Sequence, residues 1–331
     1  MNIAINGFGK IGRSFLRAAI KKGIIKNFDR IVINDFGDIE NMAYLFKYDS
    51  PDNTNLDIRI DKDILIIDKK EIQTIHEPEI KKLPWKNFDI DLVIESTGKF
   101  SDKEEIKDHF IAGAKKILVS SPSKYSEITL VKGLNFWKLT KEHKIISIAS
   151  CTTNCIAPLI KVLDENFGIK NGFFTTTHAY TSDQKLLDTY HKDFRRGRSA
   201  AMNIIPTTSG AARSIGELMP HLKGKFNGYS LRVPVSNGSI ATLFLNLKKN
   251  TDKEQINKLF LTESMNKMKE IIDYSKDPLV SGDIINNSNS CIFDSSLTEC
   301  LDNSVIISGW YDNEWAYSNR LVDAVSLILM I

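Results

Sequence analysis

The chain has 331 residues, 42% of them hydrophobic and 26% charged, which is typical of a globular protein with about two domains. The formal net charge of +3 is too small to indicate binding to nucleic acid or to a membrane. No apolar run reaches membrane-spanning length and no leader precedes the first strand-like segment, so we expect a cytoplasmic protein. Its four cysteines match neither a disulfide framework nor a metal site, which fits a reducing compartment.

The N-terminal segment carries a glycine motif between a short apolar strand and a helical pattern. Gly7 permits a tight turn, Gly9 lets the backbone approach a pyrophosphate, and Gly12 lets the helix pack on the strand. A second strand ends at Asp35, close to the spacing expected for a carboxylate that binds a ribose. A negative charge there repels a 2′-phosphate, so the pattern predicts NAD rather than NADP.

The rest of the N-terminal half alternates strands with helical segments. We predict strands at residues 91–95 and 116–119, each followed by small polar residues. A helix is expected over 102–110, with Ser101 as its cap and Glu104 completing a capping box. Together these elements predict a Rossmann-type, doubly wound parallel sheet in an α/β domain.

The pattern changes in the C-terminal half, where the strands become longer and antiparallel in character. This composition predicts an α+β domain with a largely antiparallel sheet. We therefore expect a first domain over 1–150, a second over 151–313, and a last helix over 314–331 that packs on the first. The elements expected in the second domain are strands at 172–177, 227–235 and 239–247 and an amphipathic helix at 252–273.

The segment Ser150-Cys151-Thr152-Thr153-Asn154-Cys155 lies where a buried strand changes into a helix. Unpaired N–H groups and the helix dipole at that position favour a thiolate on Cys151. Ser150 is a suitable N-cap, and Pro158 either kinks the helix or marks its true start. A buried structural thiol is the competing interpretation, ranked second because most of the segment is hydroxyl or amide residues.

Further polar groups follow the cysteine. His178 comes one helix and part of a strand later, so it can face Cys151 and activate it. A polar stretch over 181–202 contains arginines, and long loops of this kind are usually functional. Arg232 sits in an apolar strand and needs an anionic partner, either a ligand or a structural carboxylate.

The segment 150–155 resembles the active-site signature of glyceraldehyde-3-phosphate dehydrogenases. His178-Ala179-Tyr180-Thr181, Ser96-Thr97-Gly98 and the segment 307–318 extend the resemblance over nearly the whole chain. It implies a bacterial-type, NAD-dependent homotetramer of glycolysis and gluconeogenesis. Such an enzyme oxidises glyceraldehyde 3-phosphate, with inorganic phosphate, to 1,3-bisphosphoglycerate through a cysteine thiohemiacetal and thioester.

The resemblance also implies roles for individual residues. Cys151 and His178 would be catalytic. The cofactor would contact Gly9, Lys10, Ile11, Asp35, Ser120 and Asn313, with Asn313 on the nicotinamide carboxamide. Inorganic phosphate would contact Ser150, Thr152, Ser209 and Gly210, and the substrate phosphate would contact Thr181, Asp183, Arg196 and Arg232.

The sequence departs from the family pattern in several places. Ile148 stands where asparagine is usual, Lys10 replaces an arginine, Ala316 replaces a glycine, and residues 235–242 differ. None of these changes removes a group that the chemistry requires. The alternatives are an erythrose-4-phosphate dehydrogenase, an aspartate-semialdehyde-type dehydrogenase, and an NAD-binding protein of this fold that has lost turnover.

Overall fold

The computed structural model describes residues 1–50 and 54–331. The chain divides into two compact units. The first unit comprises Met1–Leu130, Phe136–Ala149 and Ser318–Ile331, and the second comprises Val131–Asn135 and Ser150–Tyr317. No helix among the described residues is both long enough and apolar enough to cross a membrane.

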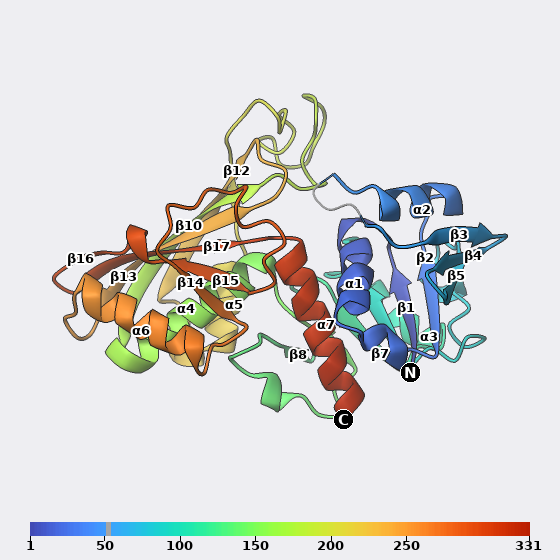
Figure 1. Cartoon of the computed structure of the whole chain (residues 1–331), viewed down its shortest axis with the longest axis horizontal. Helices are drawn as coiled ribbons and strands as arrows, with labels where there is room; N and C mark the ends of the chain where they lie inside the picture. The colour runs from blue at the N-terminus through green and yellow to red at the C-terminus, as the bar shows by residue number, and fades with distance from the viewer. Residues whose placement is uncertain (51–53) are drawn as a thin grey trace. The chain divides into compact units, whose positions relative to one another are not determined.

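A mainly parallel sheet forms the core of the first unit (Figure 1). Its strand order is β3-β4-β5-β2-β1-β6-β7-β9-β8. Strands β1, β2 and β6 pair in parallel at its centre, and their Ile, Val and Leu side chains are almost fully buried. The strands are β1 (Asn2–Asn6), β2 (Arg30–Asn34), β3 (Ile58–Asp61), β4 (Ile64–Ile67), β5 (Lys70–Ile75), β6 (Leu92–Glu95), β7 (Lys116–Val119), β8 (Ile128–Thr129) and β9 (Ile145–Ser147).

Helices of the first unit follow its strands in alternation. They are α1 (Lys10–Lys21), α2 (Ile39–Lys47) and α3 (Asp108–Ile111), with short 3₁₀ turns at Ile24–Asn27, Ile80–Lys82, Glu104–Lys107 and Phe136–Lys138. The helix α7 (Trp315–Met330) starts in the second unit, and its residues from Ser318 onward belong to the first. Alternating strands and helices around parallel strands confirm the predicted α/β class.

The second unit holds a sheet in the order β11-β12-β10-β13-β17-β15-β14, with β16 beside β17. Most pairs are antiparallel as predicted, but β10 pairs in parallel with β12, and β14 with β15. The strands are β10 (Ile169–Ala179), β11 (Ile205–Thr208), β12 (Phe226–Val233), β13 (Ser239–Leu247), β14 (Ile272–Ser275), β15 (Cys291–Asp294), β16 (Glu299–Leu301) and β17 (Ser304–Tyr311).

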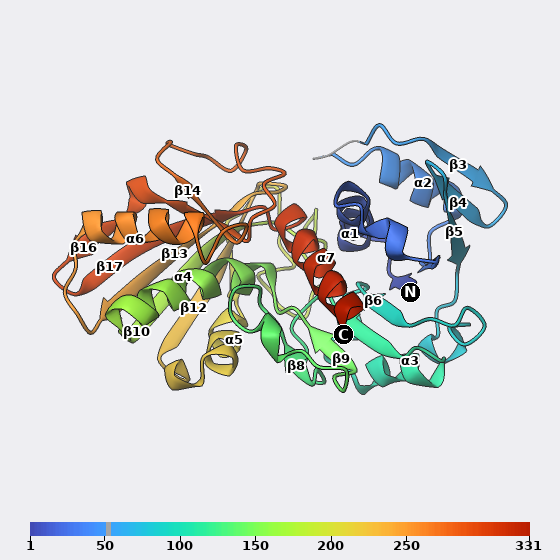
Figure 2. The ribbon, with the colours of Figure 1, turned by 60° about the horizontal axis from the view of Figure 1, so that its bottom comes forward.

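Helix α4 (Cys151–Phe167) contacts β10, β13, β15 and β17, so it covers one side of this sheet (Figure 2). Pro158 lies within α4, and the helix begins at Cys151 rather than at the proline. The remaining helices are α5 (Ala211–Leu218), which contacts β12, and α6 (Lys253–Met265), which contacts β14. Short 3₁₀ turns lie at Pro220–Leu222 and Ser295–Leu297.

Two predicted helices differ from the structure. The expected capping box is wrong, because the segment forms a 3₁₀ turn followed by the single turn α3, and Glu104 pairs with Lys107. The backbone carbonyl of Ser101 instead accepts a hydrogen bond from the hydroxyl of Ser123, which ties this segment to another loop. The helix expected over 252–273 ends at Met265, after which the chain turns into β14.

Candidate functional site

The glycine loop between β1 and α1 has the shape that the sequence predicts. Gly7 has φ of +93°, which favours glycine, and its N–H donates to the carbonyl oxygen of Asn34 at 2.8 Å. A Cβ on Gly12 would lie 2.2 Å from the carbonyl oxygen of Gly7, so only glycine allows α1 to pack this closely. A Cβ on Gly9 would meet nothing within 4 Å, so the backbone there is open to a ligand.

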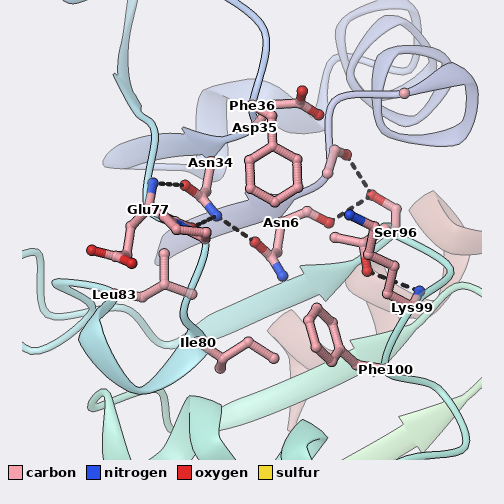
Figure 3. Close-up of a pocket in the computed structure, with 14 residues that line it drawn as sticks. Asn6, Asn34, Asp35, Phe36, Glu77, Ile80, Leu83, Ser96, Lys99 and Phe100 are labelled. Atoms are coloured by element: carbon pink, nitrogen blue, oxygen red, sulfur yellow. Dashed lines mark hydrogen bonds between the residues drawn. The ribbon is translucent and has the colours of Figure 1, made fainter.

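A pocket of about 150 Å³ lies beside this loop (Figure 3). Ring and aliphatic side chains form its apolar walls, and amide, hydroxyl and carboxylate groups supply its polar contacts. The lining residues are Asn6, Gly7, Gly9, Asn34, Asp35, Phe36, Glu77, Pro78, Ile80, Leu83, Ser96, Thr97, Lys99 and Phe100. Flat apolar walls with a few polar groups suit the adenosine half of a dinucleotide.

Asp35 lies at the end of β2, where the sequence predicts a ribose contact. Its carboxylate accepts hydrogen bonds from the backbone N–H of Phe8 at 2.5 Å and of Gly37 at 3.1 Å. Each oxygen keeps a lone pair for a ribose hydroxyl. The open backbone at Gly9 and this carboxylate therefore fit NAD, and the negative charge disfavours a 2′-phosphate.

The structure brings together only some of the residues predicted for the cofactor. Gly9 and Asp35 line the pocket, whereas Lys10 and Ile11 begin α1, and the ammonium group of Lys10 pairs with Asp49. Ser120 follows β7 and is not among the lining residues, and Asn313 belongs to the second unit.

Other lining residues were not predicted from the sequence. Pro78, Ile80 and Leu83 lie in a connection without a periodic pattern, so no sequence signal marks them. Asn34 precedes Asp35 at the end of β2, and the rule that ligands bind at strand ends could have identified it.

The second unit contains the predicted cysteine and histidine. The Ser150 hydroxyl caps α4 by accepting from the backbone N–H of Thr153 at 3.0 Å, as predicted. Cys151 is the first residue of the helix, and its Sγ lies 3.3 Å from Nε2 of His178. His178 lies on β10 and is 3% exposed, so the imidazole faces the thiol from inside the protein.

His178 makes two further contacts through Nδ1. This nitrogen lies 2.6 Å from the carbonyl oxygen of Ala179 and 2.6 Å from Nη1 of Arg232, which stands opposite His178 in the parallel register of β10 and β12. The carbonyl can only accept and the guanidinium can only donate. Nδ1 can therefore hydrogen-bond to the carbonyl or to the guanidinium, but not to both at once. When the neutral ring donates from Nδ1 to the carbonyl, Nε2 has no proton, and when Nδ1 accepts from the guanidinium, Nε2 carries the proton.

Both members of the pair are electrically neutral at rest. Burial, and then the charge of Arg232, lower the pKa of His178 from 6.5 to about 3. Burial also raises the pKa of the Cys151 thiol, although Arg232 and hydrogen bonds from Thr152 and the helix N-terminus lower it in opposition. Burial of Cys151 therefore opposes the thiolate that the helix terminus and Arg232 favour.

Tyr311 is a functional candidate that the sequence did not identify. Its buried hydroxyl lies 3.0 Å from the Thr152 hydroxyl and 2.7 Å from that of Thr176, and its ring meets the His178 ring edge-on at 5.9 Å. These contacts hold Thr152 beside the thiol. Three different elements supply them, which is why no sequence spacing reveals them.

The predicted phosphate residues fall into separate groups. The guanidinium of Arg196 pairs with Asp183 and donates from Nε to the Thr207 hydroxyl at 2.8 Å. The Thr181 N–H donates to the Gln184 side chain at 3.0 Å.

Two further phosphate candidates, Ser209 and Gly210, precede α5, and Gly210 is its N-cap without a side-chain bond. A helix start of this kind can bind an anion through its N–H groups, although the Ala211 N–H here donates to the Ser209 hydroxyl at 3.4 Å. Within the described residues, no hydrogen bond joins Ser209 or Gly210 to Cys151.

Comparisons with known proteins identify the family. Residues 1–103 match the family model described as the NAD binding domain of glyceraldehyde 3-phosphate dehydrogenase, and residues 150–313 match its C-terminal domain. The chain belongs to the glyceraldehyde-3-phosphate dehydrogenase family.

Full-length relatives agree with this assignment. Glyceraldehyde-3-phosphate dehydrogenase 2 of Streptomyces avermitilis is 45% identical over 98% of this chain and 97% of that protein. The enzyme of Streptomyces coelicolor is 46% identical over the same shares, and that of Mycobacterium avium is 45% identical over 99% and 98%. Family membership makes this chain an NAD-dependent oxidoreductase that acts on an aldehyde.

Proposed function

We propose that this protein catalyses the phosphorylating oxidation of glyceraldehyde 3-phosphate to 1,3-bisphosphoglycerate, with reduction of NAD, in glycolysis and gluconeogenesis. The observation that carries the proposal is the Cys151 thiol 3.3 Å from Nε2 of His178, beside Arg232, in a chain of this family. A thiol, a base and a fixed positive charge are the groups that aldehyde oxidation through a thioester requires.

The chemistry starts with addition of the Cys151 sulfur to the aldehyde carbon. The thiol proton passes by way of His178 to the aldehyde oxygen, which gives a thiohemiacetal. Bound NAD supplies the hydride acceptor. His178 takes the thiohemiacetal hydroxyl proton as the carbon is oxidised, and a thioester remains on Cys151. An oxygen of inorganic phosphate then attacks the thioester carbon, and the sulfur leaves.

Residues around the pair would hold the two phosphate groups. We assign Thr181, Asp183, Arg196 and Arg232 to the phosphate of the substrate, and Ser150, Thr152, Ser209 and Gly210 to inorganic phosphate. The guanidinium groups support the first assignment because they bind phosphate with charge and directed donors. Asp183 orients Arg196 through their ion pair rather than contacting an anion itself.

The cofactor assignment covers Gly9, Lys10, Ile11, Asp35, Ser120 and Asn313. We propose that Asn313 binds the nicotinamide carboxamide. Its Oδ1 accepts from the Ser239 hydroxyl at 2.8 Å, which leaves its NH₂ group to donate. Asp35 would accept from the ribose hydroxyls.

We also propose that the protein assembles as a homotetramer and acts in the cytoplasm. Leu186, Leu187, Tyr190 and Phe194 in the loop after β10 are 74% to 89% exposed, and so many large apolar side chains in one loop suggest a subunit contact. A mechanism through the Cys151 thiol requires a reducing compartment, because oxidation would remove the nucleophile.

The test is NADH formation with glyceraldehyde 3-phosphate, with and without inorganic phosphate. Turnover that depends on phosphate and is lost in Cys151→Ser, but kept in the matched control Cys300→Ser, would support the proposal. Faster turnover of erythrose 4-phosphate than of glyceraldehyde 3-phosphate would instead indicate an erythrose-4-phosphate dehydrogenase. Binding of NAD without turnover of either aldehyde would indicate a protein that has lost catalysis.

A further inference from the structure

A chain of buried polar groups leads from the interior of the first unit to the nucleotide pocket. Nε1 of Trp85 donates to Nδ1 of His109 at 2.9 Å, and Nε2 of His109 lies 3.1 Å from Oε2 of Glu95. The same oxygen accepts from the Asn6 amide at 2.6 Å. None of these four side chains is more than 2% exposed, so each depends on the others for its hydrogen bonds.

Trp85 fixes the proton position on His109. The indole N–H can only donate, so Nδ1 of His109 must accept and its proton must be on Nε2. A charged imidazolium would place two N–H groups face to face at 2.9 Å. His109 is therefore a neutral ring that donates to Glu95.

Glu95 is an acceptor at both oxygens. Oε1 accepts from the backbone N–H of Thr97 at 2.9 Å and from its hydroxyl at 2.5 Å. Oε2 accepts from His109 and from Asn6. The Thr97 N–H and the His109 Nε2–H are obligatory donors. A donor in place of either carboxylate oxygen would therefore remove one of these hydrogen bonds.

The direction of these hydrogen bonds fixes the amide of Asn6. Since its NH₂ group donates to Glu95, its carbonyl oxygen accepts from the NH₂ group of Asn34 at 2.8 Å. Asn34 is held independently, because its amide accepts from the N–H of Glu77 at 2.9 Å and donates to the Glu77 carbonyl at 3.0 Å. The hydrogen bonds to Glu95 and to Asn34 therefore require the same orientation of the Asn6 amide.

One N–H of Asn6 remains after these bonds are counted. Asn6 lines the pocket, and Figure 3 shows its amide between Asn34 and the side chains of Ile80 and Phe100. Asp35 lines the same pocket at the strand end where an adenosine ribose is expected. The remaining N–H therefore belongs to the part of the site that would receive the adenosine half of the cofactor.

We propose that Glu95, supported by His109 and Trp85, is a positioning residue that makes Asn6 present an N–H donor to an acceptor atom of the adenosine half of NAD. The inference rests on the proposed cofactor but not on the proposed reaction. It concerns affinity for the nucleotide, because none of these three residues lines the pocket.

Glu95→Gln tests the proposal. A glutamine amide has one acceptor and one donor, so either orientation sets an NH₂ group against Thr97 N–H or against His109 Nε2–H. Thr97 and Asn6 both line the pocket, so either conflict disturbs it. We expect affinity to fall on the order of tenfold, as for a mismatched buried hydrogen bond.

Calorimetric titration would compare NAD with ADP-ribose, which has the adenosine half but no nicotinamide. Glu95→Gln should weaken both by the same factor. Asp91→Asn is the matched control: Asp91 precedes the same strand, and its carboxylate accepts from the Asn2 N–H at 2.7 Å outside the pocket. Glu95→Gln should lower the affinity for ADP-ribose less in a protein that already carries Asn6→Leu than in the wild type.

Unchanged ADP-ribose affinity in Glu95→Gln, or additive losses in the double variant, would overturn the proposal. If the variant does not fold, ¹⁵N NMR of the wild type tests the proposal instead. A proton on Nδ1 of His109 would contradict it, because Nδ1 must accept the hydrogen bond from Trp85. Failure of the proposed reaction is seen separately, as ADP-ribose binding without phosphate-dependent turnover.

Discussion

The neutral state of His178 makes a quantitative prediction about stability and pH. Its pKa is lowered from 6.5 to about 3 by burial and by Arg232, whereas the unfolded chain keeps the ordinary value. The stability that His178 contributes is therefore fully present above pH 6.5 and is lost as the pH falls, because the unfolded state then binds the proton more readily. Integrating this difference gives a loss of about 2 kcal/mol between pH 7 and pH 5, or roughly 30-fold in the unfolding equilibrium.

The comparison is between the wild type and His178→Gln, which cannot titrate in this range. Urea unfolding at pH 7 and pH 5 would give four free energies, and other titrating groups cancel in the difference between the two proteins. We expect the wild type to lose about 2 kcal/mol more than the variant over this interval. The comparison is valid where the two proteins unfold with the same dependence on urea.

Equal losses in the two proteins would refute the reasoning. That result would mean that folding leaves the pKa of His178 unshifted, so burial and Arg232 would not lower it. A wild type that loses less stability than the variant would mean that folding raises this pKa, as in an ion pair with a Cys151 thiolate.

Two other predictions concern positions where the structure leaves little room or fixes an orientation. Gly12→Ala places a methyl group against the Gly7 carbonyl oxygen. It should lower the free energy of unfolding by about 1–3 kcal/mol and should also weaken NAD binding. An unchanged melting temperature would contradict the packing argument. Ser239→Ala frees the amide of Asn313 and should raise the KM for NAD by about tenfold, while Thr242→Val, a hydroxyl loss on the same strand, should leave it unchanged.

Sequence reasoning succeeded where a local rule determines the structure. The glycine loop, the Ser150 cap and the strand that ends at Asp35 each follow from backbone requirements within a few residues. The helix expected over 252–273 failed because the apolar residues Met268 and Ile271 continue its periodicity after the chain has turned. Their burial comes from tertiary packing, which a helical pattern does not distinguish.

The interior polar groups were beyond the sequence for a different reason. Glu95 and His109 come from a strand end and from a one-turn helix, and Trp85 comes from a connection. Each residue alone resembles an ordinary polar or apolar position. Only their convergence shows that the indole N–H, the carboxylate and Asn34 together fix the direction of the hydrogen bonds from Trp85 to Asn6.

The same argument applies to the thiol site, where Arg232 acts on both partners. Its charge favours a thiolate on Cys151 but disfavours an imidazolium on His178, so it supports a thiolate beside a neutral ring. When Arg232 donates to Nδ1, Nε2 carries the proton and can donate to the sulfur. When a phosphate group engages Arg232, Nδ1–H can instead donate to the Ala179 carbonyl, which leaves Nε2 free to accept the thiohemiacetal proton. An anion bound at Arg232 should also reduce the extra stability that the wild type loses between pH 7 and pH 5 compared with His178→Gln. If this extra loss is the same with a phosphate monoester bound, Arg232 does not lower the pKa of His178 as argued.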